Sequence, residues 1–421
     1  MVGINPFRPN FPISPGMFVG RIDELKRLES YLIQTCAGKP VNFMITGERG
    51  IGKSSLLLYI TFLAQNNLVK DGRTLNLLVV DLALDKSLTQ KGLIKRVGLI
   101  LQKKLEKSEA ARKFFADVWK FVTRIEAVGI KISADNKPET PETLLEEFYS
   151  SLENTIKRIC DNSEEGGMFD SVYDGVLLLI DEADHASKEL ELGSFLKLLM
   201  ESLQRNGVNK FMVGLAGLDE LRNILIESHE SSIRLFDHIY LDRLSGEDIN
   251  RAIDLALAEA TKINAKNYKI TDDARRALVD LSEGYPHFIQ QYGFSAFEAD
   301  ADYTIGEADV LKGAFGEHGA LESIGIRYYR NDFYNKVQQE SYRQVLRIMA
   351  DELDGWITKT KIKNRFKGKG STLDNALKAL RERGIIISKE GQKGTYRLQH
   401  KGFAVWIKHH TSGLEETKSA E

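Results

Sequence analysis

The stretch GERGIGKS (residues 47–54) constrains this 421-residue chain more than any other part of its sequence. Two glycines, a lysine and a serine stand in it with the spacing G-x-x-x-x-G-K-S. Phosphate oxygens are approached most closely by bare backbone N–H groups, and a following helix points its positive end at the same charge. An apolar run at 41–45 precedes the stretch, and an apolar helical pattern at 53–65 follows it. The sequence therefore predicts a strand, a phosphate-binding loop and a helix.

Each residue of this loop and of the helix start is a candidate nucleotide contact. We expect Lys53 to reach the β- and γ-phosphates and the Ser54 hydroxyl to hold Mg²⁺, so that the expected cofactors are ATP and Mg²⁺. The alternative is a glycine-rich turn with a stray lysine, which the two flanking patterns disfavour. The nucleotide-binding candidates are Gly47, Glu48, Arg49, Gly50, Ile51, Gly52, Lys53, Ser54 and Ser55.

The stretch VLLLIDEADH (residues 176–185) supplies the acidic residues that such a loop needs. Asp181 follows five apolar residues, as expected for a strand that delivers a metal-binding carboxylate, and Glu182 is the candidate base that orients the attacking water. A cap for the next helix is the alternative interpretation of Asp181. Asp184 and His185 are interpreted as the beginning of that helix.

The pattern of the first 244 residues predicts an α/β fold with a doubly wound parallel sheet. Further apolar strands are expected at 75–83, 210–217 and 238–241, and helical stretches separate them. Residues 18–244 form this predicted core, and residues 86–160 are an expected helical insertion in it.

Two smaller domains are expected to follow. Three capped helices predict a small helical bundle at 245–316, and the order helix, helix, helix, hairpin predicts a winged helix at 338–410. Residues 1–17, with four prolines, are expected to form an extended arm, and residues 411–421 a disordered tail. The beginning of the chain has no long apolar run and the two cysteines fit no metal site, so we expect a cytoplasmic protein that does not enter a membrane.

Four motifs together resemble AAA+-type P-loop ATPases, with the archaeal initiator (origin-recognition-like) ATPases and the signal-transduction (STAND) ATPases as the nearest branches. The motifs are FVGR (18–21), GERGIGKS, LLLIDEAD and GYPHF (284–288). The resemblance implies ATP hydrolysis, a homo-oligomer, a lid and a C-terminal winged helix. It implies that Gly20 and Arg21 lie near the adenine or ribose and that Pro286 lies against the nucleotide. His287 would contact a phosphate, or the GYPHF stretch would only pack Tyr285 and Phe288 in the core.

The chain departs from the family pattern at two places. The strand at 210–217 ends in Leu215, Ala216 and Gly217, where a polar sensor of the γ-phosphate is usual, and the nearest polar side chain is that of Asp219. GYPHF stands where the initiators tend to carry an arginine, which favours the signal-transduction branch. By the same resemblance, a neighbouring subunit would supply a catalytic arginine, and the candidates are Arg234 and its competitors Arg222 and Arg243.

The charge of the chain is concentrated at its C-terminal end. Residues 355–410 contain fourteen Lys and Arg against three acidic residues, whereas the whole chain has a net charge of −2. This asymmetry favours a polyanion such as double-stranded DNA, with the third helix in the major groove. On that helix, Leu373, Ala376, Leu377 and Leu380 would face the core. The DNA-contact candidates are Ser371, Thr372, Asn375, Lys378, Arg381, Lys393 and Arg397.

Two functions follow from these patterns. The first is an ATP-binding and ATP-hydrolysing switch that oligomerises with nucleotide and engages DNA through its basic winged helix. The second is a signalling or defence ATPase of the STAND type, whose winged helix is an autoinhibitory module or contacts a protein partner.

Overall fold

The sheet at the centre of residues 12–242 consists of five parallel strands in the order β2-β3-β4-β1-β5. The structure is a computed structural model that describes residues 3–65, 74–122, 141–160, 169, 172–352 and 355–411. Strands β3 and β4 are buried along almost their whole length, which accounts for their uninterrupted apolar sequences. The strands are β1 (Asn42–Thr46), β2 (Leu77–Ala83), β3 (Gly175–Asp181), β4 (Phe211–Gly217) and β5 (Phe236–Tyr240).

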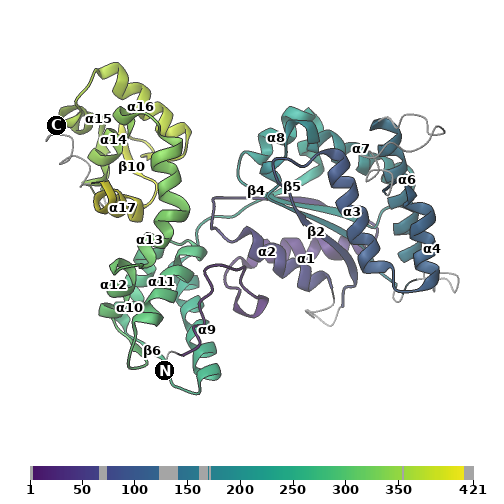
Figure 1. The fold of residues 1–421 in the computed structure, drawn as a ribbon, viewed down its shortest axis with the longest axis horizontal. Helices are drawn as coiled ribbons and strands as arrows, with labels where there is room; N and C mark the ends of the chain where they lie inside the picture. The colour runs from purple at the N-terminus through teal and green to yellow at the C-terminus, as the bar shows by residue number, and fades with distance from the viewer. Residues whose placement is uncertain are drawn as a thin grey trace, which may run out of the picture. The chain divides into compact units, whose positions relative to one another are not determined.

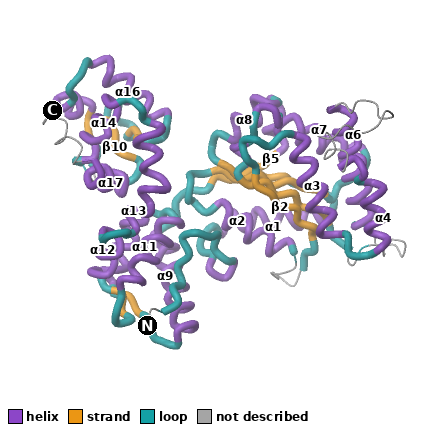
Figure 2. The backbone as a smooth tube through the Cα atoms, viewed as in Figure 1, coloured by secondary structure: helices purple, strands orange, loops and turns teal. Residues whose placement is uncertain are grey.

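Helices cover both faces of this sheet, which confirms the predicted doubly wound α/β fold (Figures 1 and 2). On one face lie α1 (Ile22–Cys36) and α2 (Lys53–Ala64). On the other lie α3 (Gln90–Leu105), α7 (Leu192–Arg205) and α8 (Leu221–Ser228). The other helices in the described part of this unit are α4 (Glu109–Val118), α6 (Pro141–Ile159) and the short turns η1 (Pro15–Met17), η3 (Ala183–His185), η4 (Lys188–Leu190) and η5 (Glu230–Leu235).

The helices at 90–160 share the hydrophobic core of the sheet. Phe148 of α6 lies 6.0 Å from Trp119 and 5.8 Å from Phe195 of α7, measured between ring centroids. The indole N–H of Trp119 donates to Thr155 Oγ1 at 3.0 Å, so its one polar group is satisfied in the interior. The insertion therefore extends the core on the α3 and α7 side of the sheet.

A second compact unit contains residues 3–11 and the described residues from Arg243 onward. Its first part is the helical lid, in which Ser245 and Asp248 form a capping box at the start of α9 and Thr271 caps α10. The lid has a fourth helix, α12, beyond the three that the sequence pattern indicates. Its elements are α9 (Gly246–Asn264), β6 (Lys269–Ile270), α10 (Asp272–Ser282), α11 (Pro286–Ala299), β7 (Thr304–Ile305) and α12 (Glu307–Phe315).

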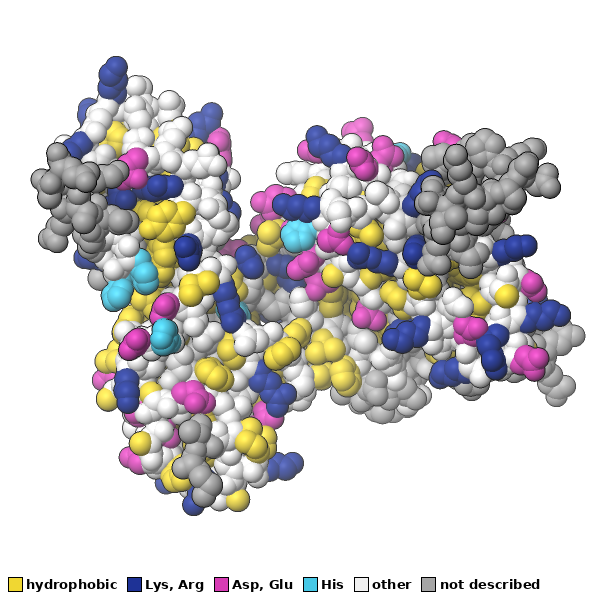
Figure 3. Space-filling model, viewed as in Figure 1, with side chains coloured by type: hydrophobic (Ala, Val, Ile, Leu, Met, Phe, Trp, Pro, Cys, Tyr) yellow, Lys and Arg dark blue, Asp and Glu magenta, His cyan; other side chains and the backbone are white. Residues whose placement is uncertain are grey.

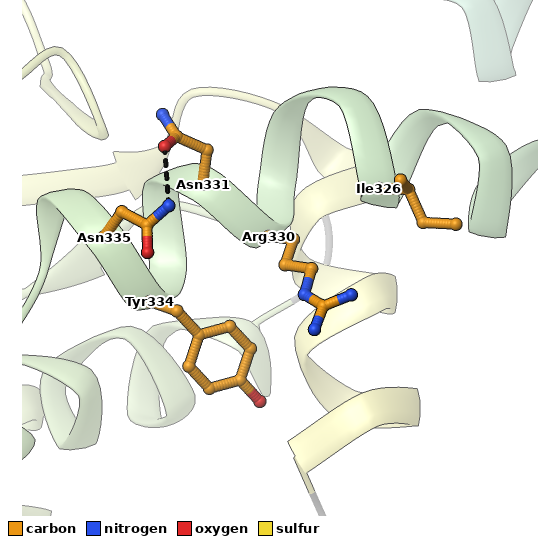
Figure 4. Close-up of a pocket in the computed structure, with 5 residues that line it drawn as sticks. All are labelled: Ile326, Arg330, Asn331, Tyr334 and Asn335. Carbon is orange, nitrogen blue, oxygen red and sulfur yellow. Dashed lines mark hydrogen bonds between the residues drawn. The ribbon is translucent and has the colours of Figure 1, made fainter.

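A helical connector leads from the lid to the last domain. It begins with α13 (Ala320–Ile324) and continues in two π-helical segments, η6 (Gly325–Tyr329) and η7 (Asn331–Lys336). One side of the connector carries a shallow pocket, in which the Asn335 amide donates to Asn331 Oδ1 (Figure 4). All residues that line this pocket come from the connector: Ile326, Arg330, Asn331, Tyr334 and Asn335.

The C-terminal domain has three helices, a three-stranded sheet in the order β8-β10-β9 and a further helix. Leu373, Ala376, Leu377 and Leu380 of α16 are buried, so the predicted core face of that helix is confirmed. The sequence pattern missed β8, which has only two residues, and α17. The elements are α14 (Glu340–Ala350), β8 (Ile357–Thr358), α15 (Lys359–Arg365), α16 (Gly370–Glu382), β9 (Ile386–Ser388), β10 (Thr395–Leu398) and α17 (Lys401–Thr411).

The described part of the N-terminal arm has no strand or α-helix. Phe7 is buried beside Gly293 of α11, and the backbone N–H of Arg8 donates to Gln290 Oε1 at 2.8 Å. The predicted tail lies outside the described residues except for Thr411, which ends α17. No helix in the described ranges is both long and apolar enough to span a membrane.

Candidate functional site

The glycine-rich loop joins the end of β1 to the start of α2. Gly47, Gly50 and Gly52 have φ values of 151°, 80° and 101°, a region that residues with a Cβ rarely adopt. A Cβ on Gly47 would also lie 2.7 Å from the carbonyl oxygen of Leu241, the residue after β5. Glycine is therefore needed here for its backbone conformation and for space, and the loop keeps the form that a phosphate-binding backbone requires.

Lys53 is the first residue of α2 and its amine lies over the loop. The Nζ atom donates to the carbonyl oxygens of Gly47 at 2.7 Å and of Glu48 at 2.9 Å. Burial lowers the pKa of Lys53, and three nearby carboxylates act in the opposite direction by favouring its charged form. These carboxylates belong to Asp184, Asp181 and Asp219.

Ser54 and Asp181 meet at the carboxyl edge of the sheet. The Ser54 hydroxyl donates to Asp181 Oδ2 at 2.6 Å, although the two residues are 127 positions apart in the chain. They come together because β1 and β3 run parallel and end at the same edge. A hydroxyl and a carboxylate are oxygen ligands of the kind that Mg²⁺ takes together with substrate phosphates and waters. The described residues contain no cluster of three or more His, Cys, Asp or Glu side chains that would form a separate metal cage.

Glu182 follows Asp181 in a left-handed conformation, with φ of 50°. Its side chain is 59% exposed, and Oε2 lies 3.5 Å from Nδ1 of His185. Its backbone N–H donates to Asp181 Oδ1 at 2.8 Å, which ties it to the residue that is the metal-ligand candidate. The carboxylate is therefore open to water beside the Ser54–Asp181 pair.

Asp184 belongs to this site, although sequence reasoning assigned it only to the start of a helix. Asp184 and His185 do form a helical turn, the 3-10 helix η3. The Asp184 side chain is 10% exposed, and its Oδ1 accepts a hydrogen bond from the backbone N–H of Leu218, just after β4, at 3.0 Å. One sequence signal could have indicated this contact: Asp184 stands three residues after Asp181, and the neighbouring strand ends in Gly217, which has no side chain.

Arg21 stabilises the glycine-rich loop through a hydrogen bond to its backbone. Gly20 and Arg21 both have left-handed φ values, 67° and 59°, and form the turn before α1. The Arg21 guanidinium is largely buried and donates to the carbonyl oxygens of Ile51 (3.3 Å) and Asp242. This arrangement links the FVGR segment to the loop through Ile51, while any contact with an adenine or ribose stays a prediction.

The first turn of α2 is also touched by the N-terminal arm. Ser55 Oγ accepts a hydrogen bond from the backbone N–H of Ile13 at 3.1 Å. The ring of Phe18, just after the arm, lies 5.3 Å from that of Tyr59 on α2. The segment that precedes α1 is therefore anchored beside the loop, whereas Arg49 at the loop's tip is exposed.

Comparison with known proteins identifies the domain that contains this site. Residues 17–212 match the family model described as the AAA ATPase domain, and the match includes the glycine-rich loop, Asp181 and Glu182. This part of the chain is an AAA ATPase domain.

Some similar proteins align with nearly the whole chain. The chain is 26% identical over 407 residues to an uncharacterized HTH-type transcriptional regulator of Methanocaldococcus jannaschii, covering 94% of this chain and 90% of the relative. The Aeropyrum pernix ORC2 protein, solved as ADPNP–ADP complexes, is similar in structure with a TM-score of 0.58 and 15% identity, covering 100% of both chains. A Walker-type ATPase of Pyrococcus abyssi has a TM-score of 0.53 and 16% identity, covering 93% of this chain and 96% of that one. At these identities the two structures show a shared fold.

The three arginines considered as a subunit-bridging residue differ in their surroundings. Arg234 lies in η5, between α8 and β5, and is exposed, as is Arg222 on α8. Arg243 instead lies in the second unit, where its guanidinium is 4.7 Å from the ring centroid of Tyr285 and 3.9 Å from Glu283 Oε2. This structural role of Arg243 leaves Arg234 and Arg222 as the candidates.

Pro286 and His287 begin α11 of the lid. Pro286 occupies the first turn, where its missing N–H costs no hydrogen bond. The His287 ring lies 5.3 Å from that of Tyr328 in the connector, and Tyr285 and Phe288 are buried. The core packing considered for GYPHF is therefore present, and a phosphate contact of His287 stays a prediction.

The winged helix presents most of the predicted DNA-contact residues at its surface. Ser371, Asn375 and Lys378 on α16 are exposed, and Thr372 is half-buried. Figure 3 shows Lys and Arg side chains on the C-terminal domain, where Figure 1 labels α15 and α16. Several of the positive charges are paired: Lys359 with Asp374, Lys361 with Glu352, Arg365 with Asp351, and Lys378 with Glu382 at 3.9 Å.

The two predicted contacts in the hairpin differ from each other. Lys393 lies in the exposed turn between β9 and β10. Arg397 is half-buried in β10, and its guanidinium lies 5.0 Å from the ring centroid of Trp356. Lys393 is therefore free to reach a phosphate, whereas Arg397 stacks within the domain.

Proposed function

We propose that this protein binds ATP with Mg²⁺, hydrolyses it, and uses the cycle to control its engagement of double-stranded DNA. We further propose that it acts as a homo-oligomer in the cytoplasm. The observation that carries the proposal is the contact of Ser54 with Asp181 at 2.6 Å, with the Lys53 amine over the same loop. Glu182, the residue that hydrolysis needs, follows Asp181 directly.

Different residues of the site bind the phosphates, hold the metal ion and activate the attacking water. Backbone N–H groups of the loop and the Lys53 amine bind the phosphates, and Ser54 and Asp181 hold the metal ion. When bound, Mg²⁺ neutralises charge on the phosphate oxygens. The exposed Glu182 carboxylate orients a water molecule and accepts its proton as the water oxygen bonds to the γ-phosphorus, while the bond from that phosphorus to the β–γ bridging oxygen breaks and ADP leaves.

Oligomerisation is supported by the position of Arg234. An arginine that stabilises charge on a neighbour's nucleotide must reach out of its own subunit. Arg234 is exposed and lies in the last turn of η5, and Arg222 on α8 is the second candidate.

DNA engagement is supported by the charge and surface of the winged helix. Fourteen Lys and Arg residues stand against three acidic residues at 355–410, and α16 exposes small polar and basic side chains. The helix-turn-helix type of the Methanocaldococcus jannaschii relative agrees with this function. Because Lys and Arg contacts with phosphates displace counterions, the binding should weaken steeply as salt rises.

Charge reversal on α16 tests this function. We expect the double variant Lys378→Glu, Arg381→Glu to bind duplex DNA at least about 10-fold more weakly, and its salt slope to fall by about 2, because two phosphate contacts are lost. A gel shift with a duplex at several salt concentrations measures both quantities.

The matched control carries the same charge change on the lid. Lys262→Glu, Lys312→Glu alters two exposed residues of α9 and α12 and should bind DNA as the wild-type protein does. An equal loss in both variants would mean that only net charge matters. Failure of the wild-type protein to bind DNA at low salt would remove this function.

The packing of α17 against the lid favours a second function, a signalling ATPase restrained by its winged helix. Glu283, the residue before GYPHF, is 7% exposed, and its Oε1 accepts hydrogen bonds from the backbone N–H groups of Lys401 (2.8 Å) and Gly402 (3.4 Å). His400 lies 4.8 Å from Tyr285 between ring centroids, and burial, with help from Arg243 and Arg397, lowers the pKa of His400 to about 3. A buried carboxylate thus caps the last helix and ties the winged helix to the lid motif.

Replacing Glu283, the cap of α17, distinguishes the restrained signalling ATPase from the DNA-binding switch. If the winged helix restrains the ATPase, Glu283→Ala should raise basal ATP turnover several-fold and reduce the amount of ADP that copurifies with the protein. Glu307→Ala, which changes an exposed carboxylate in the first turn of α12, is the control. Unchanged turnover in a folded Glu283→Ala variant would argue against the restrained form.

A further inference from the structure

We propose that Asp184 is a positioning residue of the ATPase site, which fixes the turn carrying Glu182 by tying it to the end of β4. This inference rests on the proposed hydrolysis of ATP. It gives a role to a carboxylate that lies against the end of β4, where the family pattern has a polar sensor and this chain has Gly217.

The contact between the two strand ends is built for Asp184. Asp184 Oδ1 accepts the backbone N–H of Leu218 at 3.0 Å, and only 10% of the side chain is exposed. A Cβ on Gly217 would lie 2.7 Å from the same oxygen and 3.0 Å from the Asp184 backbone nitrogen. Gly217 has an ordinary backbone conformation, because its φ lies outside the left-handed region. Glycine is therefore needed at this position for space alone, and the space is taken by the Asp184 carboxylate.

The turn that carries Glu182 has a strained backbone and requires a stabilising contact. Glu182 adopts φ of 50°, which costs free energy for a residue with a side chain and persists only when its surroundings enforce it. The chain then makes a single 3-10 turn, in which the backbone N–H of His185 donates to the Glu182 carbonyl oxygen at 2.8 Å. The Asp184–Leu218 hydrogen bond holds the far side of this turn to β4, so the direction of the Glu182 side chain depends on it.

The surroundings of Asp184 are those of the reaction site. The Asp184 carboxylate is one of three negative charges that act on the Lys53 amine, together with those of Asp181 and Asp219. His185 joins the two carboxylates of the turn, with Nδ1 at 3.5 Å from Glu182 Oε2 and Nε2 at 3.9 Å from Asp184 Oδ2. A shift of this turn would therefore move the candidate base and the charges around the phosphate-binding lysine together.

Substitutions of Asp184 separate the hydrogen bond from the charge. Asp184→Asn keeps an oxygen that can accept from Leu218, so we expect its kcat to stay within about threefold of the wild-type value. Asp184→Ala loses the acceptor, and we expect kcat for ATP hydrolysis to fall at least about 10-fold while the Kd for ATP changes less than about threefold. Thermal melting of each variant reports whether it folds.

Gly217→Ala tests the Asp184–Leu218 hydrogen bond by a change at the end of β4. The added Cβ displaces the carboxylate, so this variant should reproduce the fall in kcat, and the double variant Asp184→Ala, Gly217→Ala should be no worse than either single change. Gly16→Ala is the control, because a Cβ there meets nothing within 4 Å.

The outcomes distinguish this inference from the function on which it rests. A wild-type protein without ATP turnover would overturn both. A wild-type protein that hydrolyses ATP, with Asp184→Ala equally active, would overturn the positioning role alone. A folded Asp184→Asn variant as inactive as Asp184→Ala would also overturn it, because the charge and not the hydrogen bond would then be required.

Discussion

Replacing Lys53 with alanine should weaken ATP binding at least about 100-fold. The Lys53 amine is a cation directed at the loop, and hydrogen bonds to charged groups contribute about 1.5–3 kcal/mol each, so losing two phosphate contacts removes at least about 3 kcal/mol. The pKa of Lys53 is lowered by burial, and bound phosphates would reverse that direction by favouring the charged amine. Titration with a fluorescent ATP analogue measures the loss.

The fold should survive this change. In the structure Lys53 donates only to two loop carbonyls, Gly47 O and Glu48 O, so the melting temperature should change little. Lys91→Ala, on the exposed surface of α3, is the control for removing one lysine from the same unit. Tight ATP binding by a folded Lys53→Ala variant would contradict the assignment of the loop.

Replacing Glu182 with glutamine should leave ATP bound and unhydrolysed. The amide has nearly the shape of the carboxylate but cannot accept the proton of the attacking water, and such a loss lowers the rate by roughly 10²–10⁴-fold. Because Lys53, Ser54 and Asp181 are unchanged, the Kd for ATP should stay near the wild-type value. Single-turnover hydrolysis and a binding titration on the same preparation measure the two quantities.

Glu189→Gln provides the comparison for this experiment. Glu189 is an exposed carboxylate of the short turn η4, seven residues further along, and its replacement removes one negative charge without touching the site. Unchanged turnover in Glu182→Gln would exclude Glu182 as the base. A joint loss of ATP binding and turnover would show that the substitution disturbs the adjoining Asp181.

Most of the ATPase core could be predicted because its determinants are local. Gly47, Gly52, Lys53 and Ser54 lie within eight residues, and an apolar strand and an apolar helix on either side set their context. Asp181 could be added because parallel strands end at one edge of a sheet, and its 2.6 Å contact with Ser54 agrees with that reasoning. The first three helices of the C-terminal domain could likewise be predicted from the spacing of apolar residues such as Leu373 and Leu377.

Contacts between distant segments could not be predicted. The sequence pattern placed Asp184 at the start of a helix. Its carboxylate accepts the Leu218 N–H only because the end of β4 lies beside it and Gly217 has no Cβ to exclude it. Arg397 is one of fourteen positive residues in its segment, and only packing brings Trp356 beneath its guanidinium. Glu283 capping α17 joins residues more than a hundred positions apart.

By itself the sequence determined the chemistry that this chain carries: a phosphate-binding loop, an acidic strand end and a basic C-terminal domain. Backbone conformation at glycines and the periodicity of apolar residues are properties of short segments, so they can be read from the order of residues. The tertiary structure decided which side chains are partners, because a hydrogen bond or a cap depends on where separate elements meet in space. Arg21 at the loop, Asp184 at β4 and Glu283 at α17 acquired their roles in this way.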